Sequence, residues 1–178
     1  METIFLNDNG KRKGFIEVVS GGLAVGAPPL VSLLEKVHKK YGNLDWNNLF
    51  DDAIYYSKNG FIVGERLEKL IKKAPHLKNS LSAKTYFDLD KGGLKAGTLK
   101  TNIKFAETLE KIKNIGSKAI LEGDISDSII DVVNNHKINP GILVREDFAI
   151  VEPIIKDPLC ENYRGWKICG MGPPSSGG

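Results

Sequence analysis

The sequence predicts an α+β protein in which a mainly helical portion is followed by a C-terminal β-hairpin. Up to about residue 140, apolar residues recur every three or four positions, which is the spacing of amphipathic helices. After the Pro140-Gly141 turn the spacing approaches the alternation that is typical of strands. We therefore expect one domain over residues 1–178, with a helical lobe at 28–139 and strands at 142–178.

Five helices are expected in the lobe, and each has a start or stop signal. The first follows Pro28-Pro29, because proline suits the first turn of a helix, and it ends at Gly42. Asp45 is expected to cap the second helix and Thr101 the fourth. Gly60, Pro75 and Gly116 are expected to end the second, third and fourth helices, and the fifth spans 124–136. The expected inner faces are Val31, Leu34, Val37 and Tyr41; Trp46, Leu49, Phe50, Ala53 and Ile54; Leu67, Leu70 and Ile71; Phe105, Ala106, Leu109 and Ile112; and Ile125, Ile129, Ile130 and Val133.

Two stretches lack helical spacing. Residues 78–99 are polar and contain several glycines, so we expect an exposed excursion there. Residues 150–155 and 163–168 are expected to pair as an antiparallel hairpin around a turn near 157–162, with Pro153 at an edge or a bulge. Because an isolated hairpin is only marginally stable in water, its neighbouring strands are expected to lie outside this sequence.

Composition excludes several classes of protein. A chain of 178 residues with 41% hydrophobic and 26% charged residues can bury a core, which argues against disorder. The net charge is only +3, and four of the 25 basic residues are arginines, so a nucleic-acid partner is not expected. No apolar run approaches the ~20 residues of a membrane span. The N-terminus lacks the apolar core of a signal peptide, so the chain as written is expected to be cytoplasmic.

No local sequence motif indicates a particular catalytic reaction. Cys160 and Cys169 are nine residues apart; base rates favour two free thiols, although the pair could also face each other across a hairpin. A metal site is not expected, because the cysteines and the three histidines lack ligand spacing. The glycine-rich segment 21–26 is a weak phosphate-loop signal. Acidic pairs occur at Asp51-Asp52, Asp124/Asp127 and Glu146-Asp147, and helix starts or turns explain them.

Several stretches, taken together, resemble the large-subunit region of bacterial γ-glutamyltranspeptidase, also called glutathione hydrolase. The strongest is YRGW…GMGPPSSGG at 163–178, which resembles the family signature YRGY…GMPPPSSGG. Departures include Pro29 in place of a glycine, Gly172 in place of the first of three prolines, and Ile120-Leu121 in place of an aromatic pair. Further matches occur in the family's order at 22–28, 41–46, 53–54, 60–63, 116–119, 123–125 and 141–148.

The resemblance implies an N-terminal-nucleophile hydrolase with an αββα sandwich, of which this chain would be an internal piece. In that family a freed N-terminal threonine attacks the γ-glutamyl carbonyl, with its own α-amino group as base. The γ-glutamyl group then passes to water, an amino acid or a peptide. Neither a cofactor nor a metal is implied. The resemblance also implies a periplasmic or secreted protein, which conflicts with the expectation from the N-terminus and leaves the localisation open. The partners implied are γ-glutamyl compounds such as glutathione, in the complete enzyme only, and a complementary small-subunit chain.

No catalytic or substrate-binding residue transfers from the family to this chain. The five threonines are Thr3, Thr85, Thr98, Thr101 and Thr108, and none stands in the context of the family's nucleophile. Arg145 belongs to a different motif from the substrate-binding arginine. The chain alone is therefore expected to be inactive; a non-enzymatic binding or assembly module and a degraded gene remnant are the alternatives. The segment expected beside the cleft, or else serving as a rigid strand exit, is Pro173, Pro174, Ser175, Ser176, Gly177 and Gly178.

Overall fold

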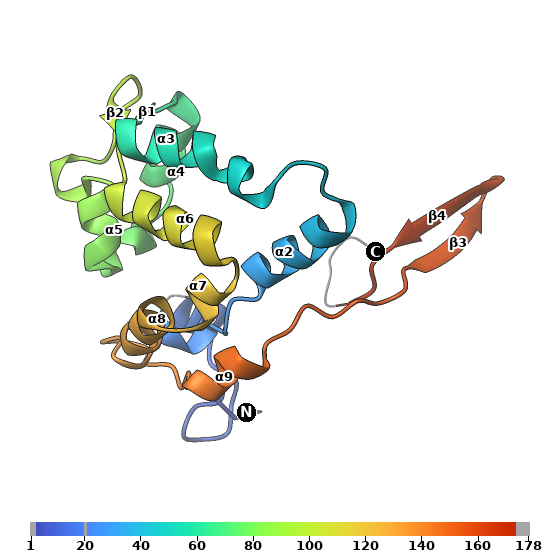
Figure 1. The fold of residues 1–178 in the computed structure, drawn as a ribbon. Helices are drawn as coiled ribbons and strands as arrows, with labels where there is room; N and C mark the ends of the chain where they lie inside the picture. Colours follow the sequence, from blue (N-terminus) through green and yellow to red (C-terminus); the bar gives the residue numbers. More distant parts are fainter. Residues whose placement is uncertain (1–2, 20, 174–178) are drawn as a thin grey trace.

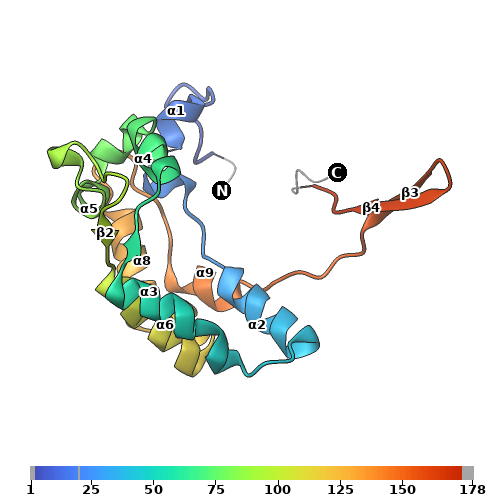
Figure 2. The same ribbon diagram turned by 90° about the horizontal axis from the view of Figure 1, so that it is seen from above.

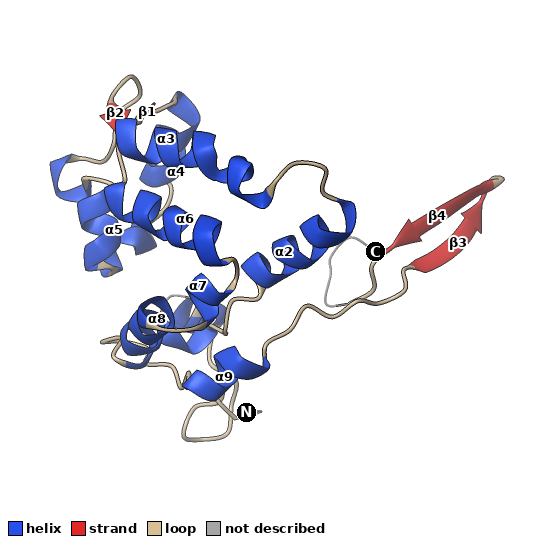
Figure 3. Cartoon of the chain, in the orientation of Figure 1, coloured by secondary structure: helices blue, strands red, loops and turns tan. Residues whose placement is uncertain are grey.

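The computed structural model describes residues 3–19 and 21–173 and places the helices first and a protruding hairpin last (Figures 1 and 2). The strands are β1 (Phe61–Ile62), β2 (Leu99–Lys100), β3 (Leu159–Tyr163) and β4 (Trp166–Gly170). The helices are α1 (Phe15–Val18), α2 (Leu30–Tyr41), α3 (Asp51–Asn59), α4 (Glu65–Lys72), α5 (Leu81–Tyr86), α6 (Ile103–Ile115), α7 (Lys118–Leu121), α8 (Asp124–Asn134) and α9 (Arg145–Ile150). The expected α+β class is confirmed (Figure 3).

The centre of the helical lobe is α6, which packs along α3 and against the 3₁₀ turn Trp46–Phe50 (Figure 1). Ala106, Leu109 and Ile112 of α6 are buried, as their spacing predicts, whereas Phe105 of the same predicted face is exposed. The cap differs from the prediction, because Asn102 and not Thr101 accepts a hydrogen bond from the backbone N–H of Phe105 at 3.1 Å. Asparagine is as good a cap as threonine, so sequence alone did not separate these neighbours.

The segment 78–99 is not the exposed excursion that its polarity predicts. Leu94 is buried with Val63 and Ile71, and Phe87 and Leu89 pack against this cluster. The segment forms α5 and short 3₁₀ turns, and then folds back so that β2 pairs with β1. A few apolar side chains are therefore enough to pack this segment against the core, although most of its residues are polar.

A second core cluster lies where α8 meets α9. Val133, Leu143 and Phe148 are buried, and Ile129 and Ile130 pack against them. Helix α9 lies within the 142–178 stretch that the sequence predicts to form strands. The packed helical lobe is therefore longer than the predicted 28–139, because residues 22–27 and helix α9 also pack on α8. A side-chain contact explains its start, because Asp147 accepts a hydrogen bond from the backbone N–H of Val144 at 3.0 Å.

The hairpin exists, but its first strand and its turn differ from the prediction. Residues 150–155 do not form a strand: Ile150 ends α9, and 151–158 are neither helix nor strand. Proline at 153 and 158 cannot donate to a strand ladder, which explains why pairing begins only at β3. The turn is Arg164-Gly165, where φ is +49° and +83°, which is a two-residue hairpin loop with positive φ at both positions.

Helix α2 has the predicted bounds but not the predicted burial. None of its residues is buried, and Leu34, Val37 and Tyr41 of the expected inner face are exposed. Its apolar spacing therefore predicts the helix correctly, whereas no element among the described residues covers that face.

Candidate functional site

The C-terminal arm carries the longest family-like motif. The arm, residues 151–173, leaves α9 and extends away from the helices to the hairpin (Figure 2). Pro173 is exposed, whereas the other residues of the expected cleft segment, 174–178, lie outside the described residues. Their role beside a cleft therefore stays a prediction.

The hairpin has one apolar face and one polar face. Directly paired residues share a face, and successive residues alternate. One side of the hairpin therefore carries three pairs: Leu159 with Gly170, Glu161 with Ile168, and Tyr163 with Trp166. Their large apolar side chains are exposed, and Trp166 is 76% accessible to solvent. We call these side chains, Leu159, Tyr163, Trp166 and Ile168, the apolar hairpin face.

Cys160 and Cys169 form a disulfide on the opposite face, so the prediction of two free thiols is wrong. The two residues are directly paired across β3 and β4, with their Cα atoms 4.1 Å apart. The reason is the register: a two-residue loop centred on Arg164-Gly165 places position 160 opposite position 169. The predicted turn at 157–162 contains Cys160 and therefore does not pair it with Cys169, whereas the observed turn at Arg164-Gly165 does.

Two depressions lie on either side of α9. The first, the apolar groove, has a volume of about 770 Å³ and lies between the segments 22–27 and 142–144 and the residues 150–152. The second, the polar pocket, has a volume of about 630 Å³. Charged walls distinguish the polar pocket, because Lys36, Glu122, Arg145 and Glu152 all line it.

The glycine-rich segment 21–26 serves close packing and does not form a phosphate cradle. The backbone N–H groups of Gly22 and Leu23 both donate to the carbonyl oxygen of Asn139, at 2.6 and 3.3 Å. A Cβ atom on Gly22 would lie 2.1 Å from the carbonyl oxygen of Val133 and 2.5 Å from the nitrogen of Gly141. Donors that already bind a carbonyl are not available to an anion.

The acidic pairs are spread over the lobe, and each pair has at least one member with a structural partner. Asp51 pairs with Lys113 at 2.6 Å, and Asp124 pairs with Lys111 at 2.5 Å. Asp127 binds Arg145, also at 2.6 Å. The hydrogen bond from Lys111 lowers the pKa of Asp124, which is the shift expected of a carboxylate in an ion pair. These pairs therefore tie helices together and do not converge on a reaction centre.

Glu35 was not singled out from the sequence, although it has the most perturbed surroundings. It forms an ion pair with Lys39 at 2.9 Å and accepts the backbone N–H of Ser117 at 3.0 Å. These hydrogen bonds, Lys39 first, lower the pKa of Glu35 from 4.5 to about 2. The carboxylate thus holds α2 against the turn between α6 and α7. No pattern signalled it, because its partner is a backbone group 82 residues away.

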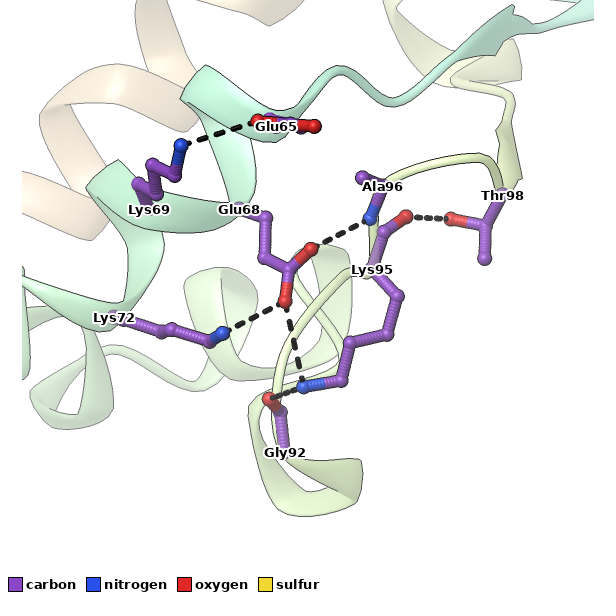
Figure 4. A network of polar contacts seen from close by, with 8 residues as sticks. All are labelled: Glu65, Glu68, Lys69, Lys72, Gly92, Lys95, Ala96 and Thr98. Carbon is purple, nitrogen blue, oxygen red and sulfur yellow. Dashed lines mark hydrogen bonds and ion pairs between the residues drawn. The ribbon is translucent and has the colours of Figure 1, made fainter.

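Glu68 organises a second polar network between α4 and the loop 92–98 (Figure 4). Its carboxylate binds Lys72 at 2.8 Å and accepts the backbone N–H of Ala96 at 2.9 Å, and Lys95 lies 3.9 Å away. Lys95 also donates to the carbonyl oxygen of Gly92 at 3.1 Å. These contacts, Lys72 first, lower the pKa of Glu68. The network fixes the loop that carries the buried Leu94.

Among residues 3–19 and 21–173, no group of three or more His, Cys, Asp or Glu side chains is placed to hold a metal ion. In the same part of the chain, no helix has the length and apolar character needed to cross a bilayer.

Comparison with known proteins gives these features a context. The family model described as gamma-glutamyltranspeptidase matches residues 1–178. Scoloptoxin SSD14 of Scolopendra dehaani is 32% identical over 161 residues, which are 88% of this chain and 27% of that protein. The glutathione hydrolase proenzyme of Escherichia coli is 29% identical over 177 residues, which are 98% of this chain and 30% of the proenzyme.

Solved structures share the fold. The Helicobacter pylori gamma-glutamyltranspeptidase superposes with a TM-score of 0.87 at 32% identity, over 99% of this chain and 50% of that chain. The enzyme from Pseudomonas nitroreducens, complexed with L-DON, gives 0.84 at 25% identity and the same coverage. The chain thus spans about half of these structures and under a third of the curated relatives above. Because the family model covers the whole of its 178 residues, the chain belongs to the γ-glutamyltranspeptidase family.

Proposed function

We propose that this chain supplies a large-subunit segment of a γ-glutamyltranspeptidase, and that catalysis belongs to the assembled enzyme. The reaction would be cleavage of the γ-glutamyl amide bond of glutathione and related compounds, with transfer of the γ-glutamyl group to water, an amino acid or a peptide. The segment would need a complementary chain that carries the threonine nucleophile.

The observation that carries this proposal is the apolar hairpin face. Four large apolar side chains project from a two-stranded hairpin, and among the described residues β3 pairs only with β4. Two strands alone are marginally stable, and unpaired edges are open to further strands. A hairpin of this kind is therefore suited to completion by other strands of a sheet, and solved relatives extend over a further half of their length.

The chain's own threonines are unsuited to act as the nucleophile, which supports a nucleophile supplied from outside these 178 residues. The family nucleophile gains its free α-amino group when the precursor is cleaved in front of it, and none of the five threonines in this sequence stands in the sequence context of that nucleophile. Two of their hydroxyl groups also donate to backbone carbonyls: Thr98 to Lys95 at 2.7 Å, and Thr108 to Lys104 at 3.0 Å. We therefore expect no turnover from the isolated chain.

In the assembled enzyme, residues 28–139 would form the outer helical lobe, and the hairpin within 142–178 would join the central sheets. The segment Pro173–Gly178, which follows β4, would lie beside the cleft. The apolar groove would also be covered, because its walls come from the 22–27 and 142–152 segments next to the start of the arm.

A chimera tests this proposal. Residues 1–178 replace the matching half of the Helicobacter pylori chain, and release of p-nitroaniline from γ-glutamyl-p-nitroanilide is measured for the chimera and for the isolated chain. The chimera should turn over and should respond to glycylglycine as acceptor. The isolated chain should not exceed buffer.

The control is the same chimera with residues 159–170 replaced by a glycine-serine linker, which should lose activity. Turnover by the isolated chain would contradict the proposal. So would a chimera that is monodisperse and melts cooperatively but shows no turnover, a result that would favour the non-enzymatic module.

A further inference from the structure

We propose that the Cys160–Cys169 disulfide is a redox-sensitive clamp that keeps the β3–β4 hairpin closed, and that reduction opens the hairpin. The inference stands apart from the proposed function, because it concerns the hairpin of this chain whether or not an enzyme is assembled.

The disulfide lies at the open end of the hairpin. The two cysteines face each other in the ladder, one pair in from Leu159 and Gly170, which form the open end of the hairpin. The Arg164-Gly165 turn closes the other end. The disulfide therefore joins the strands where they would otherwise begin to separate.

The described residues give the hairpin little other support. The apolar hairpin face is uncovered, and residues 151–158 form neither helix nor strand between the hairpin and α9. Backbone pairing, the turn and the disulfide are the restraints that the described residues supply. Because a free two-stranded hairpin is marginal, the covalent link should decide whether it stays closed.

The disulfide is accessible to a reductant from the polar side of the hairpin. Cys160 and Cys169 share a face with Asn162 and Lys167, opposite the apolar hairpin face. Cys169 is exposed and Cys160 is half-buried. A small dithiol or a redox enzyme can therefore approach the sulfur atoms from the polar side, even when a partner covers the apolar side.

The chemical step is a thiol–disulfide exchange with a dithiol reductant. One thiolate of the reductant attacks Sγ of Cys169, the S–S bond breaks, and the sulfur of Cys160 leaves as a thiolate that takes up a proton. The second thiol of the reductant then closes its own disulfide and releases Cys169 as a thiol. The protein gains two electrons and two protons, and the dithiol is oxidised to a disulfide.

The test is hydrogen exchange of the full 178-residue chain, followed by mass spectrometry, with and without dithiothreitol as the dithiol reductant. Thiol alkylation under denaturing conditions counts free thiols in parallel. We expect no free thiol in the oxidised chain and two after reduction. Closure of a ring of about ten residues restrains the open state, so reduction should speed exchange of the hydrogen-bonded amides of 159–170 on the order of 100-fold. Exchange in α6 should not change.

Two double variants complete the experiment. Cys160→Ser with Cys169→Ser should exchange as fast as the reduced chain and should ignore the reductant. Asn162→Ser with Lys167→Ser alters the neighbouring pair on the same face, keeps the disulfide, and should still respond. Equal exchange in the oxidised and reduced chains would overturn the proposal, as would two free thiols in the chain after mild oxidation.

Discussion

The helical lobe and the C-terminal arm solve the problem of stability in different ways. Every buried hydrophobic side chain among the described residues lies between Val63 and Phe148. The arm has none, and Ile154, Ile155 and Trp166 are about three-quarters exposed. A helix satisfies its backbone hydrogen bonds internally and needs other elements only to cover its apolar face. A strand needs neighbouring strands for its backbone hydrogen bonds and further elements to cover its apolar face. The lobe is therefore stabilised by its own buried core, whereas the arm has no such core.

The largest effect should come from the core of the lobe. Phe148 is 2% exposed and packs with Val133 and Leu143, so Phe148→Ala should lower the free energy of unfolding by about 3–5 kcal/mol. Ile154→Ala in the arm, at a side chain that is 76% exposed, should change it by less than about 0.5 kcal/mol. Urea unfolding followed by circular dichroism measures both. Similar losses at the two sites would erase the contrast.

Gly22→Ala should destabilise the lobe through a steric clash. Its new methyl group would overlap the carbonyl oxygen of Val133 and the nitrogen of Gly141, both of which are backbone atoms, so a loss of about 1–3 kcal/mol is expected. The matched control is Gly26→Ala in the same segment, where nothing lies within 4 Å of the added atom. Thermal melting of the two variants should separate them clearly, and coincident curves would show that the close approach at Gly22 does not constrain the fold.

Glu35 should make part of the lobe's stability depend on pH. Its pKa is lowered from 4.5 to about 2, so its contribution is complete above about pH 4.5 and disappears as the pH falls towards 2. Glu35→Ala leaves the Ser117 N–H without its acceptor and should cost about 1–2 kcal/mol at neutral pH.

Glu35→Gln is the matched control, because it keeps an oxygen for Ser117 but loses the charge that faces Lys39. It should cost less than the alanine variant. Unfolding free energies measured from pH 7 to pH 2 should fall less steeply for Gln than for the native chain. Parallel pH profiles would show that the carboxylate does not hold α2 in place.

The smallest effect belongs to the turn of the arm. Gly165 has φ of +83°, so Gly165→Ala should weaken the hairpin by about 1 kcal/mol, while Arg164→Gly should relieve the residue at +49° and strengthen it slightly. Amide exchange of 159–170 reports both changes. The melting of the lobe should not respond to either one, and a shift in that melting would mean that the arm and the lobe unfold together.

Helix positions could be predicted from the sequence because their signals are local. Apolar spacing placed α2, α4, α6 and α8, and Gly42, Gly60 and Gly116 marked helix ends correctly. The second predicted helix is an α-helix only from Asp51, because 46–50 form a 3₁₀ turn, and the side chain of Asp45 accepts no cap hydrogen bond. Burial was harder, because α2 carries the same pattern and buries nothing. Spacing states which face of a helix is apolar, but whether another element covers it depends on the rest of the chain.

The arm could be predicted only in outline, because strand pairing is set by register. Moving the turn to Arg164-Gly165 moves every cross-strand pair, and with them the partner of Cys160. The cysteine spacing contained that information, since positions 160 and 169 are symmetric about this turn. The contacts of Glu35 with Ser117 and of Glu68 with Ala96 are long-range and involve backbone groups, so no sequence motif marks them.

The two tryptophans allow the most direct test, because one lies in each region. Trp46 packs against Phe50 and donates to the carbonyl oxygen of Ile112 at 3.2 Å, whereas Trp166 lies on the apolar hairpin face. Acrylamide quenching is measured for Trp166→Phe and Trp46→Phe variants of the isolated chain. The same variants are then measured in the chimera, with the native tryptophans of the relative's half replaced by phenylalanine. We predict that acrylamide quenches the fluorescence of Trp166 strongly in the isolated chain and severalfold less in the chimera. The quenching of Trp46 should be the same in both. Shielding of Trp166 that already equals that of Trp46 in the isolated chain would contradict the account.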